Sequence, residues 1–374
     1  MAIRVYAGIN REKKLKDIKD LRKEIDELDK SVVELLNKRA GLAVEIGNVK
    51  SKSGKEVYDP KREAEVIEKL KKANSLLPEK ALLSIFREVI SASRSLEKRD
   101  VIAYLGPEGT FTHEAAISIF GSSVDFVPVP DFESVFNEVE KGNADYGVIP
   151  VENSIEGSVN LSLDLLAASS LYICGEKTIP ANQNLLSNCK KISEIKKLYS
   201  HTQPLGQCRK FLSKNLPGVE IKEAASTAAA AKLASKGKNS AALASLTAGE
   251  IYGLRTLKKS VQDFANNMTR FVVLSKRPAP NPDGSVKAKT SLAITLKNKP
   301  GELFSLLGHF EGKKINLTKI VSRPIPDSNW GYLFYIDFEG HRDDRAIAGV
   351  LDKLMAMSQS LKVLGSYPME PEKS

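Results

Sequence analysis

Residues 101–116 read VIAYLGPEGTFTHEAA, and the pattern of the chain changes at this stretch. It begins with a short run typical of a buried strand, passes through a loop containing Gly106 and Gly109, and ends in a helical pattern. Beyond it, short β-branched runs such as YGVIPVEN and RFVVL alternate with helical stretches to about residue 276. This alternation predicts an α/β domain over residues 99–276, which is long enough for two lobes with a cleft.

The residues before this stretch carry no strand signal, and their apolar side chains follow a helical spacing. One long helix comes first, and a second begins with Asp59 as its cap and Pro60 in its first turn. A third starts near Pro78. The stripe of the first helix consists of Ile18, Leu21, Ile25, Leu28, Val32, Leu35, Leu42, Ile46 and Val49. Because one long helix cannot bury such a stripe alone, residues 1–98 are predicted to be an all-helical domain that forms an intertwined homodimer.

The residues after the central domain begin with SKRPAPNPDGSVKAK, a proline- and glycine-containing stretch that predicts a linker over residues 277–288. Residues 289–367 then read as strand, helix, strand, strand, helix and strand, which predicts a ferredoxin-like βαββαβ domain. Residues 368–374 are expected to be a disordered tail. The predicted fold class is therefore multidomain, with all-α, two-lobed α/β and ferredoxin-like parts.

Composition and charge narrow the class of protein. With 42% hydrophobic and 27% charged residues, the chain is typical of a folded globular protein. It has no apolar run long enough to cross a membrane and no leader-like start, so we expect a cytoplasmic protein without membrane contact. The net charge is +10, but positive and negative residues are interspersed along helical faces and form no basic block. Nucleic acid is therefore not an expected partner. Cys174, Cys189 and Cys208 lack C-x-x-C spacing and are expected to be free thiols.

Cationic and polar side chains interrupt the apolar stripes of the helical domain. Arg39 falls on the stripe of the first helix, and Lys50 lies about three turns further along nearly the same face. One interpretation is that these side chains reach outward to water or pair with a glutamate. The other is a dry pocket for a small dianion, because an unpaired buried cation is costly. Its other members would be Arg62, Ser93 and Glu97.

Polar side chains also follow the predicted strands of the central domain. Thr110 lies at the start of a helix, Glu152, Asn153 and Ser154 follow the run YGVIPV, and Thr269 precedes the run RFVVL. Each could be an ordinary helix cap or turn residue. Together they favour a convergent cleft at the ends of the strands. The motifs contain no catalytic triad, phosphate loop, dinucleotide fingerprint or metal cluster, so we expect no cofactor and no metal.

The helical domain resembles the all-helical chorismate mutase family in the motifs LRKEID, KRAGLAVEIGNVK, YDPKREAEVIEKL and VISASRSLE. The resemblance implies a homodimer that rearranges chorismate to prephenate without cofactor or covalent chemistry, by holding the reactive conformer and stabilising developing charge. It implies that Arg39 and Arg62 bind the two carboxylates and that Lys50 donates to the ether oxygen. The other implied substrate contacts are Asp59, Glu63, Ser93 and, from the partner subunit, Arg22.

Glu97 differs from the commonest form of this family, in which a glutamine at this position donates a hydrogen bond to the ether oxygen. An ionised carboxylate cannot donate a hydrogen bond. We therefore expect Glu97 to be protonated during mutase turnover, as other buried catalytic carboxylic acids are.

The central domain closely resembles the prephenate dehydratase family in GPEGTFTHEAA, PVENSIEGSV, HTQPLGQC and NMTRFVVL, in this order. The resemblance implies that prephenate loses its ring hydroxyl and ring carboxylate to give phenylpyruvate, with Thr269 bonded to the departing hydroxyl and Arg270 organising anionic charge. Threonine is a weak acid, so we expect a proton relay, with Glu152 as its first candidate. The other implied substrate contacts are Thr110, Asn153, Ser154, Ser200, Thr202 and Gln207.

The last domain resembles the ACT regulatory domain found fused to prephenate dehydratases, through KNKPGELFSLLGHF and INLTKIVSRP. The resemblance implies a site for phenylalanine between paired domains, with feedback inhibition as its effect. Two family motifs are altered, since Glu302 replaces a small residue and Val321 replaces a glutamate. The implied phenylalanine contacts are Gly301, Glu302, Leu303, Asn316, Leu317, Ser322 and Arg323.

Taken together, these resemblances predict a bifunctional enzyme of phenylalanine biosynthesis. The main alternative is a non-catalytic, two-lobed amino-acid or keto-acid sensor whose helical segment serves only to dimerise. A third possibility keeps the dehydratase and has a silent mutase domain. Retention of the cationic set on the helices argues against the sensor, because dimerisation alone gains nothing from burying Arg39.

Overall fold

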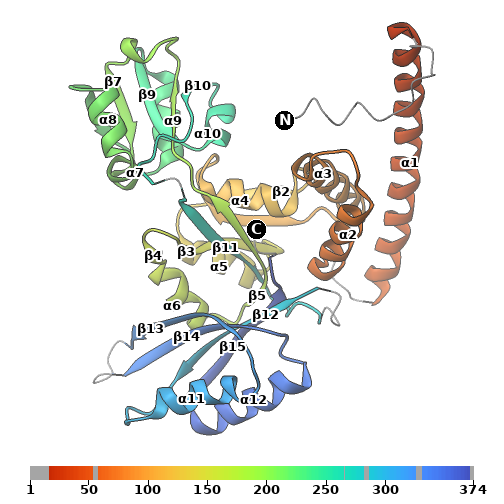
Figure 1. The fold of residues 1–374 in the computed structure, drawn as a ribbon, viewed down its shortest axis with the longest axis vertical. Coiled ribbons are helices and arrows are strands. Elements are labelled where there is room, and N and C mark those ends of the chain that lie inside the picture. Colours follow the sequence, from red (N-terminus) through yellow and green to blue (C-terminus); the bar gives the residue numbers. More distant parts are fainter. Residues whose placement is uncertain (1–16, 54–57, 265, 282–285, 326–330, 371–374) are drawn as a thin grey trace, which may run out of the picture. The chain divides into compact units, whose positions relative to one another are not determined.

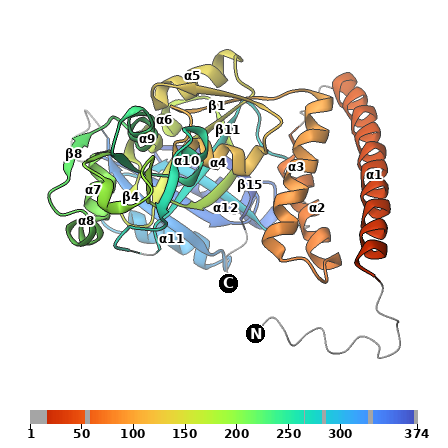
Figure 2. The same ribbon diagram turned by 90° about the horizontal axis from the view of Figure 1, so that it is seen from above.

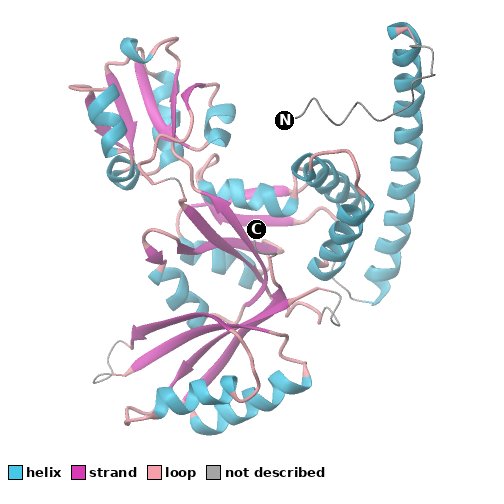
Figure 3. Cartoon of the chain, in the orientation of Figure 1, coloured by secondary structure: helices cyan, strands magenta, loops and turns pink. Residues whose placement is uncertain are grey.

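The computed structural model describes residues 17–53, 58–264, 266–281, 286–325 and 331–370. Figure 3 shows helices alone in the first part of the chain, and strands and helices together in the rest. The first strand begins at Val101, which confirms the predicted change in structure at that residue. The chain divides into two compact units, one containing the first helix with Leu96–Lys98 and the other containing the remaining described residues.

The three predicted helices are confirmed as α1 (Ile18–Ser53), α2 (Pro60–Ala73) and α3 (Glu79–Glu97). Asp59 caps α2, because its side chain accepts a hydrogen bond from the backbone nitrogen of Arg62 at 3.0 Å. The predicted stripe of α1 is exposed to solvent in the single chain, with Leu35 and Leu28 each 64% exposed. A helix with so much exposed apolar surface needs a partner to cover it.

Helices α2 and α3 lie side by side in Figures 1 and 2 and pack on the central domain. Arg94 of α3 joins the two parts, because its guanidinium lies 2.5 Å from Glu63 of α2 and donates to the carbonyl oxygen of Phe120 at 2.8 Å. Gly121, at the end of α4, permits α3 to approach closely, because a Cβ at this position would lie 2.4 Å from the Cβ of Ser91 on α3.

The first lobe of the central domain is a sheet in the order β2-β1-β3-β11-β5, with the short β4 paired to β3. Strands β1, β2 and β3 run parallel, whereas β11 is antiparallel to both β3 and β5. Helices connect the parallel strands, as the alternating sequence pattern predicts. The elements are β1 (Val101–Leu105), α4 (Phe111–Phe120), β2 (Asp125–Val129), α5 (Phe132–Lys141), β3 (Tyr146–Asn153), β4 (Gly157–Ser158), α6 (Asn160–Ala168), β5 (Tyr172–Pro180) and β11 (Met268–Ser275).

The second lobe is a five-stranded sheet in the order β10-β6-β9-β7-β8, drawn in green in Figure 1. The chain enters it after β5 and returns through β11, so two crossings join the lobes. This confirms the two-lobed prediction. The elements are β6 (Asn184–Ser187), η2 (Ile192–Glu194), β7 (Lys197–Ser200), α7 (Thr202–Gln207), α8 (Arg209–Asn215), β8 (Glu220–Glu223), α9 (Thr227–Lys236), β9 (Ser240–Ala244), α10 (Leu246–Ile251) and β10 (Arg255–Lys258).

The C-terminal part is an antiparallel sheet in the order β13-β14-β12-β15, with α11 and α12 together on one face (Figure 1). The order of elements confirms the predicted βαββαβ pattern. The elements are β12 (Ala288–Thr295), α11 (Glu302–Glu311), β13 (Leu317–Pro324), β14 (Tyr332–Glu339), α12 (Arg345–Met357) and β15 (Ser360–Pro368).

The C-terminal sheet packs directly on the first lobe. Gly365 of β15 lies against β5, where a Cβ would come within 2.1 Å of the carbonyl oxygen of Ile173. Lys362 donates to the carbonyl oxygens of Leu166 and Ala167 at the C-terminal end of α6, at 2.7 and 3.1 Å. The two sheets therefore share one continuous interface.

The expectation of a disordered tail is wrong for residues 368–370. Pro368 ends β15, and Glu370 forms an ion pair with Lys177 at 2.5 Å and accepts a hydrogen bond from the backbone nitrogen of Thr178 at 2.6 Å. Residues 371–374 lie outside the described residues. In the described chain, no helix is both long and apolar enough to span a membrane. All three cysteines are buried and, within the described residues, form no disulfide bond, as predicted.

Candidate functional site

Thr269 lies where β11 meets the end of β3, and its hydroxyl is held by an amide. It is the register partner of Asn153, whose side-chain nitrogen donates to Thr269 Oγ1 at 2.9 Å. The Asn153 oxygen accepts from the backbone nitrogens of Ile155 and Glu156 at 3.0 and 3.1 Å. Because Oγ1 accepts from Asn153, the single hydroxyl proton of Thr269 remains available for donation.

Further amides extend this cluster into the second lobe. Asn267 accepts from Asn153 at 2.7 Å, and its own nitrogen donates to Gln207 of α7 at 3.3 Å. Gln207 donates in turn to Glu156 at 3.0 Å. We call these five residues, Thr269, Asn153, Asn267, Gln207 and Glu156, the amide cluster. Three of them were predicted as site residues, whereas Asn267 and Glu156 were not.

The other predicted hydroxyls of the cleft take part in local structure. Thr110 caps α4 by accepting from the backbone nitrogen of His113 at 3.2 Å, and it donates to Leu105 at 2.9 Å. Ser154 ties the two strands together, donating to Asn266 at 2.8 Å and accepting from Met268 at 2.9 Å. Ser200 is buried and donates to the carbonyl oxygen of His201. Thr202 is exposed at the start of α7. For Thr110, the alternative interpretation as a helix cap is therefore confirmed.

Arg270 and Glu152 lie on the opposite face of the sheet from the amide cluster. Successive side chains of a strand point to opposite faces, so Arg270 follows Thr269 in sequence but points away from it. Its guanidinium bonds Glu176 at 2.8 Å, Asp337 at 2.5 Å and the hydroxyl of Tyr367 at 2.9 Å.

Glu152 is held on the same face as Arg270. Its carboxylate lies 3.0 Å from Lys319 and 3.8 Å from Arg270, so the expectation that it adjoins Thr269 is not met in this structure. The physical reason is again strand alternation, because Glu152 precedes Asn153 on β3.

The charges around Arg270 neutralise one another. Lys289 bonds Glu176 at 2.8 Å, so three cations (Arg270, Lys289 and Lys319) face three carboxylates (Glu152, Glu176 and Asp337). We call these six residues with Tyr367 the charge network; it joins β3, β5 and β11 to the C-terminal sheet.

Burial and pairing act in opposite directions on the groups of the charge network. Burial alone would raise the pKa of Asp337, but Arg270, Ser291 and Lys319 lower this pKa below its ordinary value. Burial likewise opposes the charge on Arg270, but Tyr367, Asp337 and Glu176 raise its pKa well above the ordinary value. Both groups are therefore held in their charged forms.

Lys50 and Glu97, two of the predicted mutase residues, are brought together. Lys50 Nζ lies 3.4 Å from Glu97 Oε2, and both side chains are largely buried. Gly47 allows this approach, because a Cβ there would come within 2.9 Å of the Cβ of Glu97. On α1, Arg22 is exposed and Arg39 is half-buried.

The remaining predicted mutase residues lie on α2, on α3 or at the cap of α2. Arg62 extends from α2 to Glu65 at 3.3 Å, and Ser93 donates to the carbonyl oxygen of Val89 at 2.8 Å. Glu63 forms an ion pair with the buried Arg94, an interaction that was not predicted. Burial raises the pKa of Glu63, and Arg94 offsets part of this shift. In this conformation, Glu63 serves the packing of α2 and α3 on the central domain.

The predicted phenylalanine contacts lie on α11, on β13 and in the adjoining loops. Gly301 caps α11 with φ of 87°, a conformation that favours glycine, and Leu303 is exposed beside it. Asn316 donates to Glu339 at 3.0 Å. Arg323 is bonded to Asp164 of α6 at 2.6 and 3.2 Å. The remaining three are Glu302 in the first turn of α11, and Leu317 and Ser322 on the edge strand β13.

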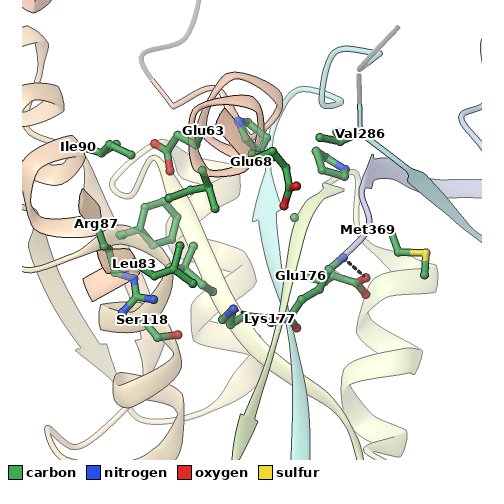
Figure 4. A pocket seen from close by; sticks show the side chains of 18 of the residues that line it. Glu63, Glu68, Leu83, Arg87, Ile90, Ser118, Glu176, Lys177, Val286 and Met369 are labelled. Carbon is green, nitrogen blue, oxygen red and sulfur yellow. Dashed lines mark hydrogen bonds and ion pairs between the residues drawn. The ribbon is translucent and has the colours of Figure 1, made fainter. Parts of the chain in front are cut away.

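A cavity of about 1200 Å³ lies elsewhere, between α2, α3, α4 and the end of the C-terminal sheet. Figure 4 shows Arg87 and Ser118 on its helical side, and Glu176 and Lys177 on its strand side. Glu63 and Glu176 line it, but the amide cluster does not. This cavity is therefore distinct from the Thr269 site. Among the described residues, no group of side chains could hold a metal ion.

Comparison with known proteins matches both enzymatic parts of the chain. Residues 21–98 match the family model for chorismate mutase type II, and residues 102–279 match that for prephenate dehydratase. The bifunctional chorismate mutase/prephenate dehydratase of Aquifex aeolicus (strain VF5) is 45% identical over 359 residues, covering 95% of this chain and 98% of that protein.

Solved structures resemble about 72% of this chain. The prephenate dehydratase of Arthrobacter aurescens in complex with L-Phe is 31% identical, with a TM-score of 0.65, over 72% of this chain and 90% of that one. GqqA, described as a novel type of quorum quenching acylase, is 28% identical with a TM-score of 0.66, over 72% of this chain and 98% of that one. The Arthrobacter protein bears the name of the matched family, whereas GqqA is described by a different activity. One fold can serve several chemistries, so structural likeness to GqqA does not indicate acylase activity. Because it is 45% identical to the Aquifex protein over nearly the full length of both, the chain belongs to the family of bifunctional chorismate mutase/prephenate dehydratases.

Proposed function

We propose that prephenate is dehydrated at the amide cluster, where the Thr269 hydroxyl donates a hydrogen bond to the departing ring hydroxyl. In this reaction the bond to the ring carboxylate breaks and its electrons enter the ring, while the carbon–oxygen bond breaks and hydroxide leaves. One proton is taken up to give water, and the other products are carbon dioxide and phenylpyruvate. Aromatisation drives the reaction, so the enzyme needs only to position the substrate and stabilise the leaving group.

The observation that carries this proposal is the hydrogen bond from Asn153 to Thr269 Oγ1 at 2.9 Å. It supplies a donor to the threonine oxygen and leaves the hydroxyl proton directed toward another acceptor. The hydrogen bond that Thr269 accepts from Asn153 polarises the Thr269 hydroxyl, which makes this hydroxyl a stronger hydrogen-bond donor. Thr110, Ser200 and Thr202 remain proposed contacts for the substrate body, because Thr110 follows β1 and the other two lie at or just after the end of β7, and α/β sheets bind ligands at the carboxyl ends of their strands.

For the mutase reaction, we propose that Lys50 and Glu97 meet the ether oxygen of chorismate. Their separation of 3.4 Å would let one oxygen atom contact both groups. Proposed contacts to the carboxylates and the hydroxyl of chorismate are Arg39, Arg62, Asp59, Glu63, Ser93 and the partner subunit's Arg22. The exposed stripe of α1 supports a homodimer, because a second copy would cover it.

For the C-terminal βαββαβ unit, we propose an ACT regulatory domain that binds L-phenylalanine and inhibits the enzyme. Its strand order and the L-Phe complex of the Arthrobacter relative support this proposal. The proposed contacts are Gly301, Glu302, Leu303, Asn316, Leu317, Ser322 and Arg323. Feedback by the end product fits a cytoplasmic biosynthetic enzyme.

The experiment supplies chorismate to the purified chain and follows prephenate and phenylpyruvate with and without L-phenylalanine. We expect phenylpyruvate to form without cofactor and its formation to fall when phenylalanine is added. Gly301→Ala should weaken the inhibition, because alanine disfavours the φ of 87° at this position. Gly308→Ala is the matched control, since Gly308 lies within α11 with open space around it. Unchanged phenylpyruvate formation at saturating phenylalanine would refute the regulatory proposal.

A further inference from the structure

Glu156 is the one carboxylate of the amide cluster, and it links the two lobes. It follows Ile155 in the turn between β3 and β4, in the first lobe, and its partners Gln203 and Gln207 lie on α7 of the second lobe. We infer that Glu156 is a positioning residue of the dehydratase, which fixes the Thr269 hydroxyl as a hydrogen-bond donor. This inference rests on the role proposed above for Thr269.

The orientation of Asn153 is fixed by the turn that carries Glu156. The backbone nitrogens of Ile155 and Glu156 can only donate, so they hold the Asn153 oxygen, at 3.0 and 3.1 Å. The Asn153 nitrogen must therefore face Thr269 at 2.9 Å and the oxygen of Asn267 at 2.7 Å. Movement of this turn would release the donor to Thr269.

The side chain of Glu156 secures the same turn from the second lobe. A carboxylate only accepts, so Gln207 must present its nitrogen to Glu156, at 3.0 Å, and its oxygen to Asn267, at 3.3 Å. Asn267 is almost fully buried and is held in this direction because its nitrogen also donates to the carbonyl oxygen of Ala181. The amide of Asn153 is therefore the donor at the start of two paths: one bond goes to Thr269, and the other continues through Asn267 and Gln207 to Glu156.

Two donors converge on Glu156, which explains why the position suits a carboxylate. Gln207 donates to one carboxylate oxygen and Gln203 donates to the other. Such charge-assisted hydrogen bonds are stronger than those between neutral groups. A glutamine at this position could keep the bond from Gln207 if Gln203, which is exposed, turned its own amide. An alanine would lose both bonds and release the turn.

The test compares Glu156→Ala with Glu156→Gln in the full chain, measuring kcat and KM for prephenate. We expect Glu156→Ala to lower the dehydratase kcat roughly 10- to 100-fold, since small misplacement of a catalytic group has effects of this size. Glu156→Gln should restore most of the loss. Mutase activity in the same preparations should stay unchanged. Glu133→Ala, an exposed carboxylate on α5 of the same lobe, is the matched control and should have the wild-type kcat.

A double-mutant cycle with Thr269→Ala separates positioning from a general structural effect. If Glu156 acts through Thr269, Glu156→Ala should cause little further loss in the Thr269→Ala chain. Additive losses, or equal losses for Glu156→Ala and Glu156→Gln, would overturn the inference. A wild-type rate for Thr269→Ala would instead refute the proposed role of Thr269, so the two failures are distinguishable.

Discussion

The two faces of strand β11 differ in how they manage polar groups. On one face, Thr269 accepts a hydrogen bond from Asn153, which also donates to Asn267, and from there the bonds between neutral amides run through Gln207 to Glu156. On the other face, Arg270 and its neighbours form a charge network with equal numbers of cations and carboxylates. Adjacent residues of one motif thus lie in the proposed dehydratase site and in a domain interface.

We infer that ion pairs hold the first lobe and the C-terminal sheet together, whereas neutral amides orient the hydroxyl proton of Thr269 in the proposed site. The charge network joins the strand that carries Thr269 to β12, β13, β14 and β15 of the C-terminal sheet. A change in the C-terminal sheet can therefore reach β11 through Arg270, one residue from Thr269. This arrangement offers a physical route for the proposed effect of phenylalanine.

The largest expected effect on stability comes from breaking the charge network. Asp337→Ala removes a carboxylate 2.5 Å from Arg270 and leaves a buried guanidinium short of a partner. We expect the free energy of unfolding to fall by about 3–5 kcal/mol, measured by urea denaturation at pH 7. Because pairing lowers the pKa of Asp337, this contribution is present above the ordinary aspartate pKa and is lost as pH falls through the folded-state value.

Asp343→Ala provides the control for this prediction. Asp343 pairs with Arg342 at 3.6 Å, but its side chain is 63% exposed, so the expected loss is below about 1 kcal/mol. Equal losses for Asp337→Ala and Asp343→Ala would show that the buried network contributes no more than a surface pair.

A smaller effect is expected at Glu114, a partly buried carboxylate for which no cation pairing is seen among the described residues. It lies on α4 against Thr247 and Glu250 of α10, and burial raises its pKa to about 7 from the ordinary 4.5. A raised carboxylate pKa means that the folded state holds its proton more tightly than the unfolded state. Stability therefore falls as pH rises from the ordinary value through about 7, by on the order of 3 kcal/mol in total.

Glu114→Gln should remove this pH dependence, because glutamine does not titrate. The measurement is the thermal midpoint of both proteins between pH 5 and pH 8.5. The variant should gain on the wild type as pH rises, and parallel curves would contradict the assignment of the buried charge to Glu114.

The smallest expected effect concerns the mutase. A glutamine in place of Glu97 supplies a side-chain N–H donor for the ether oxygen, whereas an ionised carboxylate can only accept. We expect Glu97→Gln to raise the mutase rate several-fold, in the range that positioned proton donors allow. The measurement is the consumption of chorismate by both proteins, and a Glu97→Gln rate equal to or below that of the wild type would contradict the proposed contact of Glu97 with the ether oxygen.

Much of the fold could be predicted because its signals are local. The helical spacing before residue 98, the strand–loop–helix at residues 101–116 and the βαββαβ order all follow from periodicity and turn residues. Strands β6 and β10 and helices α5, α6 and α10 were not predicted. The two strands have only four residues each, too few for a clear period.

The candidate site was predicted in part, and strand alternation explains the rest. Thr269 and Asn153 were identified, but Arg270 and Glu152 were assigned to the same site although each is adjacent in sequence to one of those two. Because side chains two residues apart on a strand point to the same face, Asn267 could have been expected on the same face as Thr269. Glu156 could not be found in this way, because its role depends on a turn that brings the two lobes together.

The most direct test of the central claim supplies chorismate to the wild type, Thr269→Ala and Thr269→Ser, and follows both products over time. We predict that Thr269→Ala accumulates prephenate at the wild-type mutase rate, with phenylpyruvate formation reduced roughly 100- to 1,000-fold. Thr269→Ser keeps the hydroxyl and should retain much of the dehydratase activity. Phenylpyruvate formed at the wild-type rate by Thr269→Ala would contradict the assignment of the dehydratase chemistry to this face of β11.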